Sequence, residues 1–292
     1  MIQGQLNLIL LLPIIGAWYA DRTNRPKWAG LFLGIAAAIK IFPAFLFVYF
    51  VLRRNWKSVA VSLVSLTLIT AVTALVLGVD TYRTYVEAIL PTTVNWKGTW
   101  NNASLPGLWC KLFDPTNKTG EIMPLFHGQF LTCTATFASW GVVLAYLIRL
   151  VPRVRSRRDC DLAFGLSVTA MLLVSPVTLE HYFLLLLIPL AVVWTGLPSS
   201  RMASQPAPTT ESTTALADRW RFHAIVVALF LPVIILCNLF IPGEFPNGSA
   251  SPAYTLTVLS FQYYALMGLF YVTASSITRP PRSVNRLNRP AW

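Results

Sequence analysis

Two short stretches of the sequence set ionisable side chains beside long apolar runs. Glu180 and His181 separate two apolar runs and leave no room for a solvated loop between them. Lys40, together with Pro43, interrupts the apolar residues 28–52. A carboxylate can accept a proton, while an imidazole or an ammonium group can donate hydrogen bonds to developing negative charge. These side chains are therefore the first candidates for a chemical role.

Both positions also allow ordinary structural roles. Glu180 and His181 can cap the helix that follows them, because polar side chains near a helix N-terminus satisfy its free N–H groups. Lys40 can extend toward water from a single membrane helix that is kinked at Pro43. The residue types alone leave these alternatives open.

Composition indicates a membrane protein. The chain has 292 residues, of which 55% are hydrophobic and only 12% are charged, and its mean hydropathy is +0.59. Its long apolar runs exceed what a soluble core uses. The formal net charge is +12, but the Lys and Arg residues stand in short clusters between apolar runs, a pattern that sets membrane topology and does not indicate nucleic-acid binding. The four cysteines show no metal-binding spacing, so no metal site is predicted.

Residues 28–52 determine the predicted topology because basic residues flank them on both sides. Cytoplasmic loops collect Lys and Arg, so a single crossing would leave one basic cluster on the wrong side of the membrane. A hairpin of two half-helices that turns near Lys40 removes this conflict. A cation beside a helix breaker at membrane depth is tolerated where the backbone lines a cavity. The flanking basic residues are Arg22, Arg25, Lys27, Arg53, Arg54 and Lys57.

The apolar runs predict an all-α, polytopic transmembrane helix bundle with about seven spans plus one re-entrant helical hairpin. When the amino terminus is placed outside, successive segments alternate between the two sides of the membrane. The predicted cytoplasmic segments then hold all but five of the 23 Lys and Arg residues, which favours this topology. The five exceptions are Lys40, Arg83, Lys97, Lys111 and Lys118. The runs cover residues 5–19, 28–52, 58–79, 129–150, 162–178, 181–197, 223–241 and 254–276.

The chain divides into four predicted parts. Residues 1–197 form the transmembrane module with the candidate groups, and residues 198–222 form a flexible cytoplasmic linker rich in Ser, Thr, Pro and Ala. Residues 223–276 form two further transmembrane helices, and residues 277–292 form a basic cytoplasmic tail. Within the first part, the long stretch between Asp80 and Gln129 is predicted to be an external loop. A disulfide between Cys110 and Cys133 on that face is left open.

Four motifs in this order resemble the membrane glycosyltransferases of the GT-C superfamily: QGQLN, GLFLGIAAAIKIFP followed by RRNW, WNNASLPGL and SPVTLEHYF. The sequence is most similar to glycosyltransferase family 87, the polyprenol-phosphate-mannose-dependent mannosyltransferases, over roughly residues 1–197. The resemblance implies a GT-C-like bundle, a polyprenyl phosphate sugar as donor and a lipid or glycan as acceptor. It also implies transfer of a hexose, with mannose expected, on the non-cytoplasmic face of a bacterial inner membrane. No metal or other cofactor is expected.

The resemblance also implies roles for individual residues. Displacing a polyprenyl phosphate from a sugar requires donors on the departing phosphate and a carboxylate for the acceptor's proton. Lys40 and His181 are expected to bind the donor phosphate, and Glu180 and His181 are the catalytic candidates. Asn7 can alternatively act only as a helix cap. The expected substrate-binding residues are Gln5, Asn7, Asn101, Asn102, Ser104 and Tyr182.

The sequence departs from the family pattern at its beginning. Members of the family begin with several more spans, and a loop there supplies an Asp that is thought to be the catalytic base, whereas this chain starts almost at QGQLN. Three explanations stay open: a fragment of a longer product, a partner that supplies a missing N-terminal half, or a chain that is inactive alone. A transporter or flippase of lipid-linked glycans is the alternative class, although transporters often show internal repeats and none is visible here. A non-catalytic remnant subunit is a further alternative.

Overall fold

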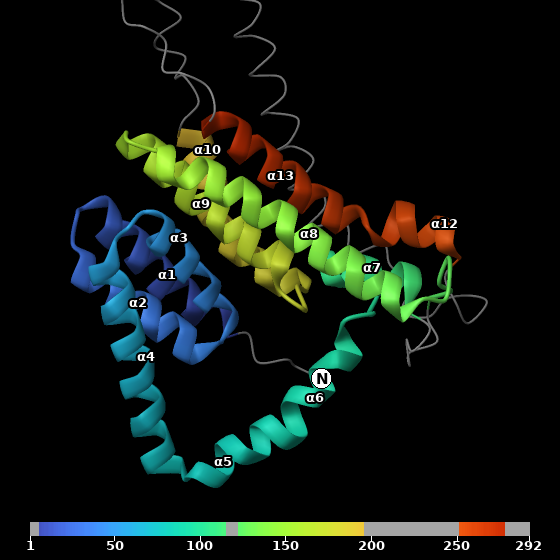
Figure 1. Cartoon of the computed structure of the whole chain (residues 1–292), viewed down its shortest axis with the longest axis horizontal. Helices are drawn as coiled ribbons and strands as arrows, with labels where there is room; N and C mark the ends of the chain where they lie inside the picture. Colours follow the sequence, from blue (N-terminus) through green and yellow to red (C-terminus); the bar gives the residue numbers. More distant parts are fainter. Residues whose placement is uncertain (1–5, 115–121, 196–250, 278–292) are drawn as a thin grey trace, which may run out of the picture.

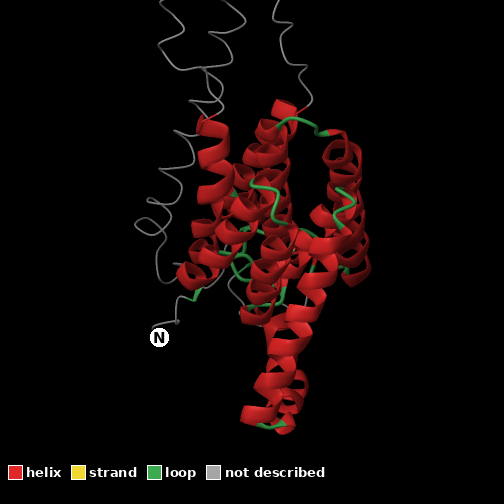
Figure 2. Cartoon of the chain, turned by 90° about the vertical axis from the view of Figure 1, so that its left-hand side faces the viewer, coloured by secondary structure: helices red, strands yellow, loops and turns green. Residues whose placement is uncertain are grey.

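The computed structural model describes residues 6–114, 122–195 and 251–277, and the regular elements in these ranges are all helices (Figures 1 and 2). This confirms the predicted all-α class. Two described helices, α4 (Trp56–Leu77) and α8 (Gln129–Leu150), are long and apolar enough to cross a membrane. A third candidate consists of residues Pro252–Leu259 and Phe261–Ile277, whose axes bend by 48°. The predicted linker 198–222, the predicted span 223–241 and tail residues 278–292 lie outside the described residues.

Shorter helices complete the bundle and its connections. The remaining elements of the body are α1 (Asn7–Arg22), α2 (Pro26–Ile39), η1 (Phe42–Leu46), α3 (Phe47–Leu52), η4 (Val151–Arg153), α9 (Arg157–Val174), η5 (Glu180–Leu186) and α10 (Leu187–Thr195). The predicted external loop contains α5 (Val79–Thr84), η2 (Tyr85–Ile89), α6 (Leu90–Thr92), η3 (Thr93–Trp96) and α7 (Leu105–Phe113). The last described segment contains α12 (Pro252–Tyr254), η7 (Thr255–Leu259) and α13 (Phe261–Ile277).

Residues 28–52 break at the predicted place and return to the end from which they started. Helix α2 stops at Ile39, because Lys40 has an extended backbone with φ −145° and ψ 140°. At the other end, the Ser58 hydroxyl donates to the Pro26 carbonyl at 3.0 Å, and the Tyr49 hydroxyl donates to Asp21 Oδ2 at 2.8 Å. Residues at or before the start of α2 therefore meet residues in α3 and at the start of α4. A single helix kinked at Pro43 does not fit this geometry.

Close packing of α2 on α4 holds the hairpin. Gly30 and Gly34 stand four residues apart on α2 and face serines of α4. A Cβ atom at Gly30 would lie 2.5 Å from the Ser58 carbonyl oxygen, and one at Gly34 would lie 2.5 Å from Ser65 Cβ. Small residues at this spacing let membrane helices approach until their backbones touch. The serine hydroxyls stay satisfied because they bond to carbonyls, as Ser62 does to Ser58 at 2.7 Å.

Helix α4 on one side and α5 with α6 on the other form a V that projects from the bundle, with its tip where α4 meets α5 (Figure 1). Figure 2 shows the same projection from the side. The side chains near the end of α4 are strongly exposed, with Leu75 at 86% and Val76 at 75%. Apolar side chains in such a position suit a lipid environment. The disulfide left open by the sequence is not formed, since Cys110 is buried, Cys133 is exposed and both are free.

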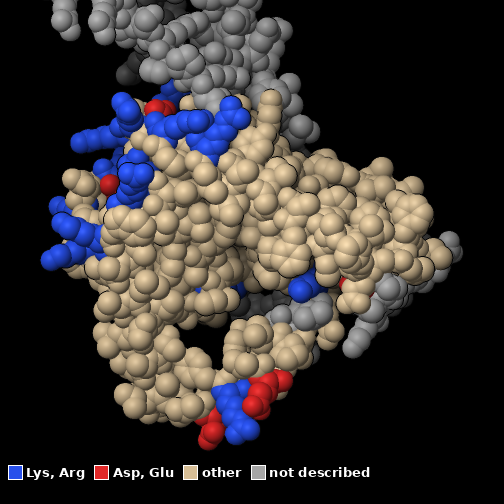
Figure 3. Space-filling view, viewed as in Figure 1, with Lys and Arg blue, Asp and Glu red and all other residues tan. Residues whose placement is uncertain are grey.

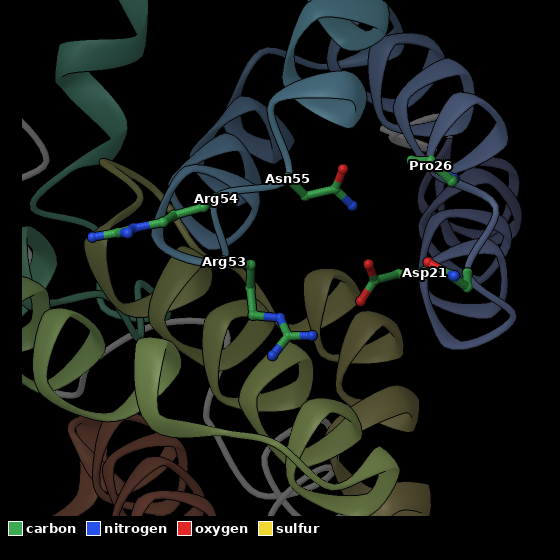
Figure 4. A pocket seen from close by; sticks show the side chains of 6 residues that line it. Asp21, Pro26, Arg53, Arg54 and Asn55 are labelled. Carbon is green, nitrogen blue, oxygen red and sulfur yellow. The ribbon is translucent and has the colours of Figure 1, made fainter.

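Basic side chains gather at one end of the molecule, at the upper left of Figure 3. Ion pairing and hydrogen bonding join helices there: Arg22 pairs with Asp161 at 3.0 Å, and Arg53 donates to the Val154 carbonyl at 2.9 Å. A cavity of about 290 Å³ opens between the two ends of the hairpin, with Arg53 and Asp21 turned toward each other and Arg54 turned away (Figure 4). Its lining residues are Asp21, Asn24, Pro26, Arg53, Arg54 and Asn55.

Candidate functional site

The turn of the hairpin brings Lys40 against the start of α1. The Lys40 ammonium donates to Asn7 Oδ1 at 2.9 Å and lies 3.4 Å from the Tyr182 hydroxyl oxygen. Asn7 is only 1% exposed, and its Nδ2 donates to the His181 carbonyl at 3.0 Å. The Asn7 amide thus joins the hairpin turn to η5. In this structure Lys40 faces the bundle, not its surroundings.

The Tyr182 ring occupies the space between the two predicted phosphate-binding side chains. The Lys40 ammonium stands 4.5 Å from the centroid of the Tyr182 ring, which suits a cation–π contact. The His181 ring stacks on Tyr182 with 4.6 Å between the ring centroids. Phe42, from the next helical turn of the hairpin, packs edge-on against Tyr182 at 5.2 Å. Lys40, His181 and Tyr182 therefore form one cluster although about 140 residues separate them in sequence, and we name these three residues with Asn7 the Lys40 cluster.

Glu180 has a polar partner from the predicted external loop. Asn101 Nδ2 donates to Glu180 Oε1 at 3.1 Å, and both side chains are partly exposed. The backbone near this pair is joined across the two segments, because the Ala103 amide donates to the Thr178 carbonyl at 2.8 Å. A partly exposed carboxylate that is oriented by an amide donor is suited to accepting a proton from a substrate hydroxyl.

Asn102 and Ser104 bind the backbone in this structure. Asn102 is fully buried; its Nδ2 donates to the carbonyls of Lys97 and Pro176, and its Oδ1 accepts from the amides of Thr178 and Ser104. Ser104 caps α7 by accepting from the Gly107 amide at 3.1 Å. Gly107 is needed for this packing because a Cβ atom there would lie 2.4 Å from Asn102 Cγ. These contacts hold residue 101 beside the Ser175–Glu180 turn.

The Lys40 cluster and the basic end of the molecule lie at opposite ends of α2. That helix has 14 residues, which corresponds to about 20 Å at about 1.5 Å per residue. Within the described ranges, no group of three or more His, Cys, Asp or Glu side chains is placed to hold a metal ion. Gln5, one of the predicted substrate-binding residues, lies outside the described residues.

Sequence reasoning missed Lys111, which is buried beside the site. Lys111 is 1% exposed, and its ammonium donates to the carbonyls of Trp100 and Asn102. A signal was present in the sequence LPGLWCKLF: Lys111 lies three and four residues after Leu108 and Gly107, on the apolar side of a short helix. A lysine at that position faces inward with its neighbours.

Three features indicate an integral membrane protein: the described elements are all helices, some of them are long and apolar, and a polar cluster lies at the turn of a broken helix. Residues 1–176 match the family model of glycosyltransferase family 87. The chain belongs to this family, as its motifs indicated. No solved structure shows a significant match to the chain.

Curated relatives come from mycobacteria. A polyprenol-phosphate-mannose-dependent alpha-(1-2)-phosphatidylinositol mannoside mannosyltransferase of Mycobacterium tuberculosis is 27% identical over 190 residues, which cover 65% of this chain and 41% of the relative. The protein of the same description from Mycolicibacterium smegmatis is 30% identical over 203 residues, with the same coverage of both chains. The alignment with each relative therefore covers about two fifths of the relative's length.

Proposed function

We propose that this chain is a membrane glycosyltransferase, or the carboxy-terminal part of one, that transfers mannose from a polyprenyl phosphate donor to a lipid or glycan acceptor. The observation that carries the proposal is the Lys40 cluster, which gathers a cation, an imidazole and a hydroxyl at the turn of a broken apolar segment. Family membership and the activity for which the mycobacterial relatives are named support the choice of donor.

The donor phosphate would lie against Lys40 and His181. In the structure, the Lys40 ammonium bonds only neutral groups among the described residues, namely Asn7 and Tyr182. An ammonium group at membrane depth without a carboxylate partner favours binding of an anion, since a bound phosphate offsets the cost of removing the charge from water. Tyr182 and Asn7 would then orient the phosphate and its sugar through their polar atoms.

The acceptor hydroxyl would lie near Glu180. Glu180 would take its proton, and Asn101 would orient the Glu180 carboxylate and contribute to binding of the substrate. We propose that Asn102 and Ser104 contribute indirectly, because they hold residue 101 in place through backbone hydrogen bonds. We also propose Gln5 as a substrate ligand, and this assignment rests only on the sequence motif QGQLN.

The proposal also fixes an orientation in the membrane. The basic end would face the cytoplasm, and the Lys40 cluster would face the opposite side, the periplasmic side of a bacterial inner membrane. Residues 1–197 would form the catalytic module, with about seven spans and the re-entrant hairpin in the complete arrangement. The linker 198–222, the two helices of 223–276 and the tail 277–292 would follow it.

A transfer assay tests the activity. Membranes that contain the full chain are supplied with radiolabelled polyprenyl phosphate mannose, and label in the lipid and glycan fractions is compared with membranes that lack the chain. We expect transfer that Glu180→Gln lowers by at least about a hundredfold, the usual range for a general acid–base residue. Glu87→Gln is the matched control, since Glu87 is exposed and pairs only with Arg83 among the described residues. Equal label with and without the chain would refute the proposed activity.

A further inference from the structure

Lys111 is a buried cation held by backbone oxygens. Its ammonium donates to the carbonyls of Asn102 at 3.0 Å, Trp100 at 3.3 Å and Leu259 at 3.5 Å. An ammonium group has three N–H donors, so these bonds use all of them. Burial lowers the pKa of Lys111 to about 7, which reflects the cost of keeping a charge in this position. A buried charge is costly unless hydrogen bonds replace those it made to water, and the three carbonyls supply them here.

Two of the three bonds lie on either side of one residue. The carbonyls of Trp100 and Asn102 precede and follow Asn101, the residue whose amide donates to Glu180. Binding both carbonyls fixes the direction of the backbone through residue 101, and therefore the direction in which its side chain leaves the backbone. Asn102 is also anchored through its own side chain to Pro176 and Thr178. Among the described residues, the Trp100 side chain makes no hydrogen bond of this kind, so the position of the Trp100 carbonyl depends on Lys111.

The third bond reaches a different part of the chain. Leu259 ends η7 in the last described segment, which lies beyond the residues 1–176 that match the family. The Leu259 side chain is 4% exposed and packs with Ile122, Trp100 and Tyr254. Lys111, on α7, thus joins residues 100–102 to the bent helix pair of residues 252–277 through one nitrogen atom.

We propose that Lys111 is a positioning residue that holds Asn101 against Glu180 by binding the carbonyl groups on both sides of Asn101, and that it links this loop to η7. The inference rests on the proposed function for its catalytic meaning, because it concerns the same site. Its structural part, the immobilisation of residues 100–103, can be tested without any activity.

The first experiment is hydrogen exchange on the purified full chain in nanodiscs. The Asn102 amide donates to Thr99 and the Ala103 amide to Thr178, so both report on order in this loop. Lys111→Met keeps the apolar stem and removes all three donors. We expect exchange at these two amides to increase at least about tenfold, as for loss of a hydrogen bond to a charged group. Lys97→Met is the matched control, because the Lys97 ammonium lies in the same loop and bonds no described residue; its exchange should equal that of the wild type.

Wild-type exchange rates in Lys111→Met would overturn the proposal. If this variant is not recovered in folded form, Lys111→Gln takes its place, since its amide has two N–H donors for three carbonyls. Faster exchange at the Asn102 and Ala103 amides in Lys111→Gln supports the proposal, and unchanged exchange overturns it.

The second experiment separates positioning of the site from a loss of folded protein. The rate of mannose transfer is expressed per folded chain, with folded chain counted from the monodisperse peak in size-exclusion chromatography. This rate should fall in both Lys111→Met and Asn101→Ala, because both changes release the Glu180 carboxylate from its amide donor. The double variant should lose no more than the larger of the two single losses, because both changes remove the same contact. A smaller amount of folded chain with an unchanged rate per folded chain would overturn the positioning role. Absence of transfer by the wild type would refute the proposed function, while the exchange result would still decide the role of Lys111.

Discussion

At the residue scale, the structure shows how polar side chains are kept satisfied in an apolar bundle. Asn7 uses its oxygen for Lys40 and its nitrogen for the His181 carbonyl, so one amide orients a cation and an imidazole-bearing segment at once. Asn102 uses both ends of its amide for four backbone groups. Such fully used amides fix segment positions more firmly than isolated bonds do.

Lys111 makes stability depend on pH in a direction that can be measured. Burial lowers its pKa in the folded chain to about 7, from 10.5 when exposed. Between these values the unfolded chain binds more protons, so folded stability should rise as pH rises from about 7 and level off near 10.5. The thermal midpoint of the wild type minus that of Lys111→Met should therefore increase between pH 7 and pH 9. The subtraction removes contributions from groups that do not interact with Lys111. A constant or falling difference would contradict the assignment.

The sequence identified residue types at this scale but not their partners. Lys40, Glu180 and His181 stood out because charges beside long apolar runs are uncommon. The contact of Lys40 with Asn7 depends on how α1 registers against the hairpin turn, and no local pattern in the sequence specifies that register. Lys111 was assigned to an external loop, and only its helical spacing from Gly107 hinted that it is buried.

At the element scale, the hairpin is the feature that positions the site. Lys40 and Pro43 were the residues from which a break in this segment is predicted. The structure has the break, with an extended backbone at Lys40. The same short segment carries its own means of packing, since Gly30 and Gly34 allow α2 to lie directly on α4. The four-residue spacing of the two glycines is visible in the sequence. Only the structure shows that they pack against serines of α4.

Substitution of Gly34 tests this packing. A Cβ atom at Gly34 would lie 2.7 Å from the Ser62 carbonyl oxygen, so Gly34→Val should force α2 away from α4. We expect a loss of about 1–3 kcal/mol, the usual cost of overpacking a close interface, seen as a lower thermal midpoint in detergent. Gly141→Val in α8 is the control, because nothing lies within 4 Å of the position of its added Cβ atom. Equal midpoints for the two variants would show that α2 and α4 are not in close contact.

At the scale of the whole molecule, the basic side chains and the Lys40 cluster lie at different ends. Basic residues cover one end, and the Lys40 cluster lies about one helix length away from it. Sequence clustering of Lys and Arg was sufficient to predict this polarity. The number of spans depends on segments outside the described residues, so the count of about seven stays a prediction.

Cysteine labelling tests the orientation. Single cysteines are placed at Ile41, Phe126 and Thr23 in a background without native cysteines, and intact cells are treated with a membrane-impermeant maleimide. We expect reaction at Ile41→Cys and Phe126→Cys, because the hairpin turn and the 80–128 loop face outward in the proposed topology. Thr23→Cys should react only after the cells are opened. Labelling of residue 23 in intact cells would refute the hairpin orientation.

Donor binding tests the central claim most directly. Binding of polyprenyl phosphate mannose to the full chain in nanodiscs is measured for the wild type, Lys40→Ala, His181→Ala and the double variant, with Lys57→Ala at the basic end as the control. We expect each single variant to weaken binding at least about tenfold, equivalent to about 1.4 kcal/mol. The double variant should lose less than the sum of the two, because both side chains bind one phosphate, and the control should bind as the wild type does. Wild-type affinity in Lys40→Ala would contradict a donor-phosphate site at the hairpin turn.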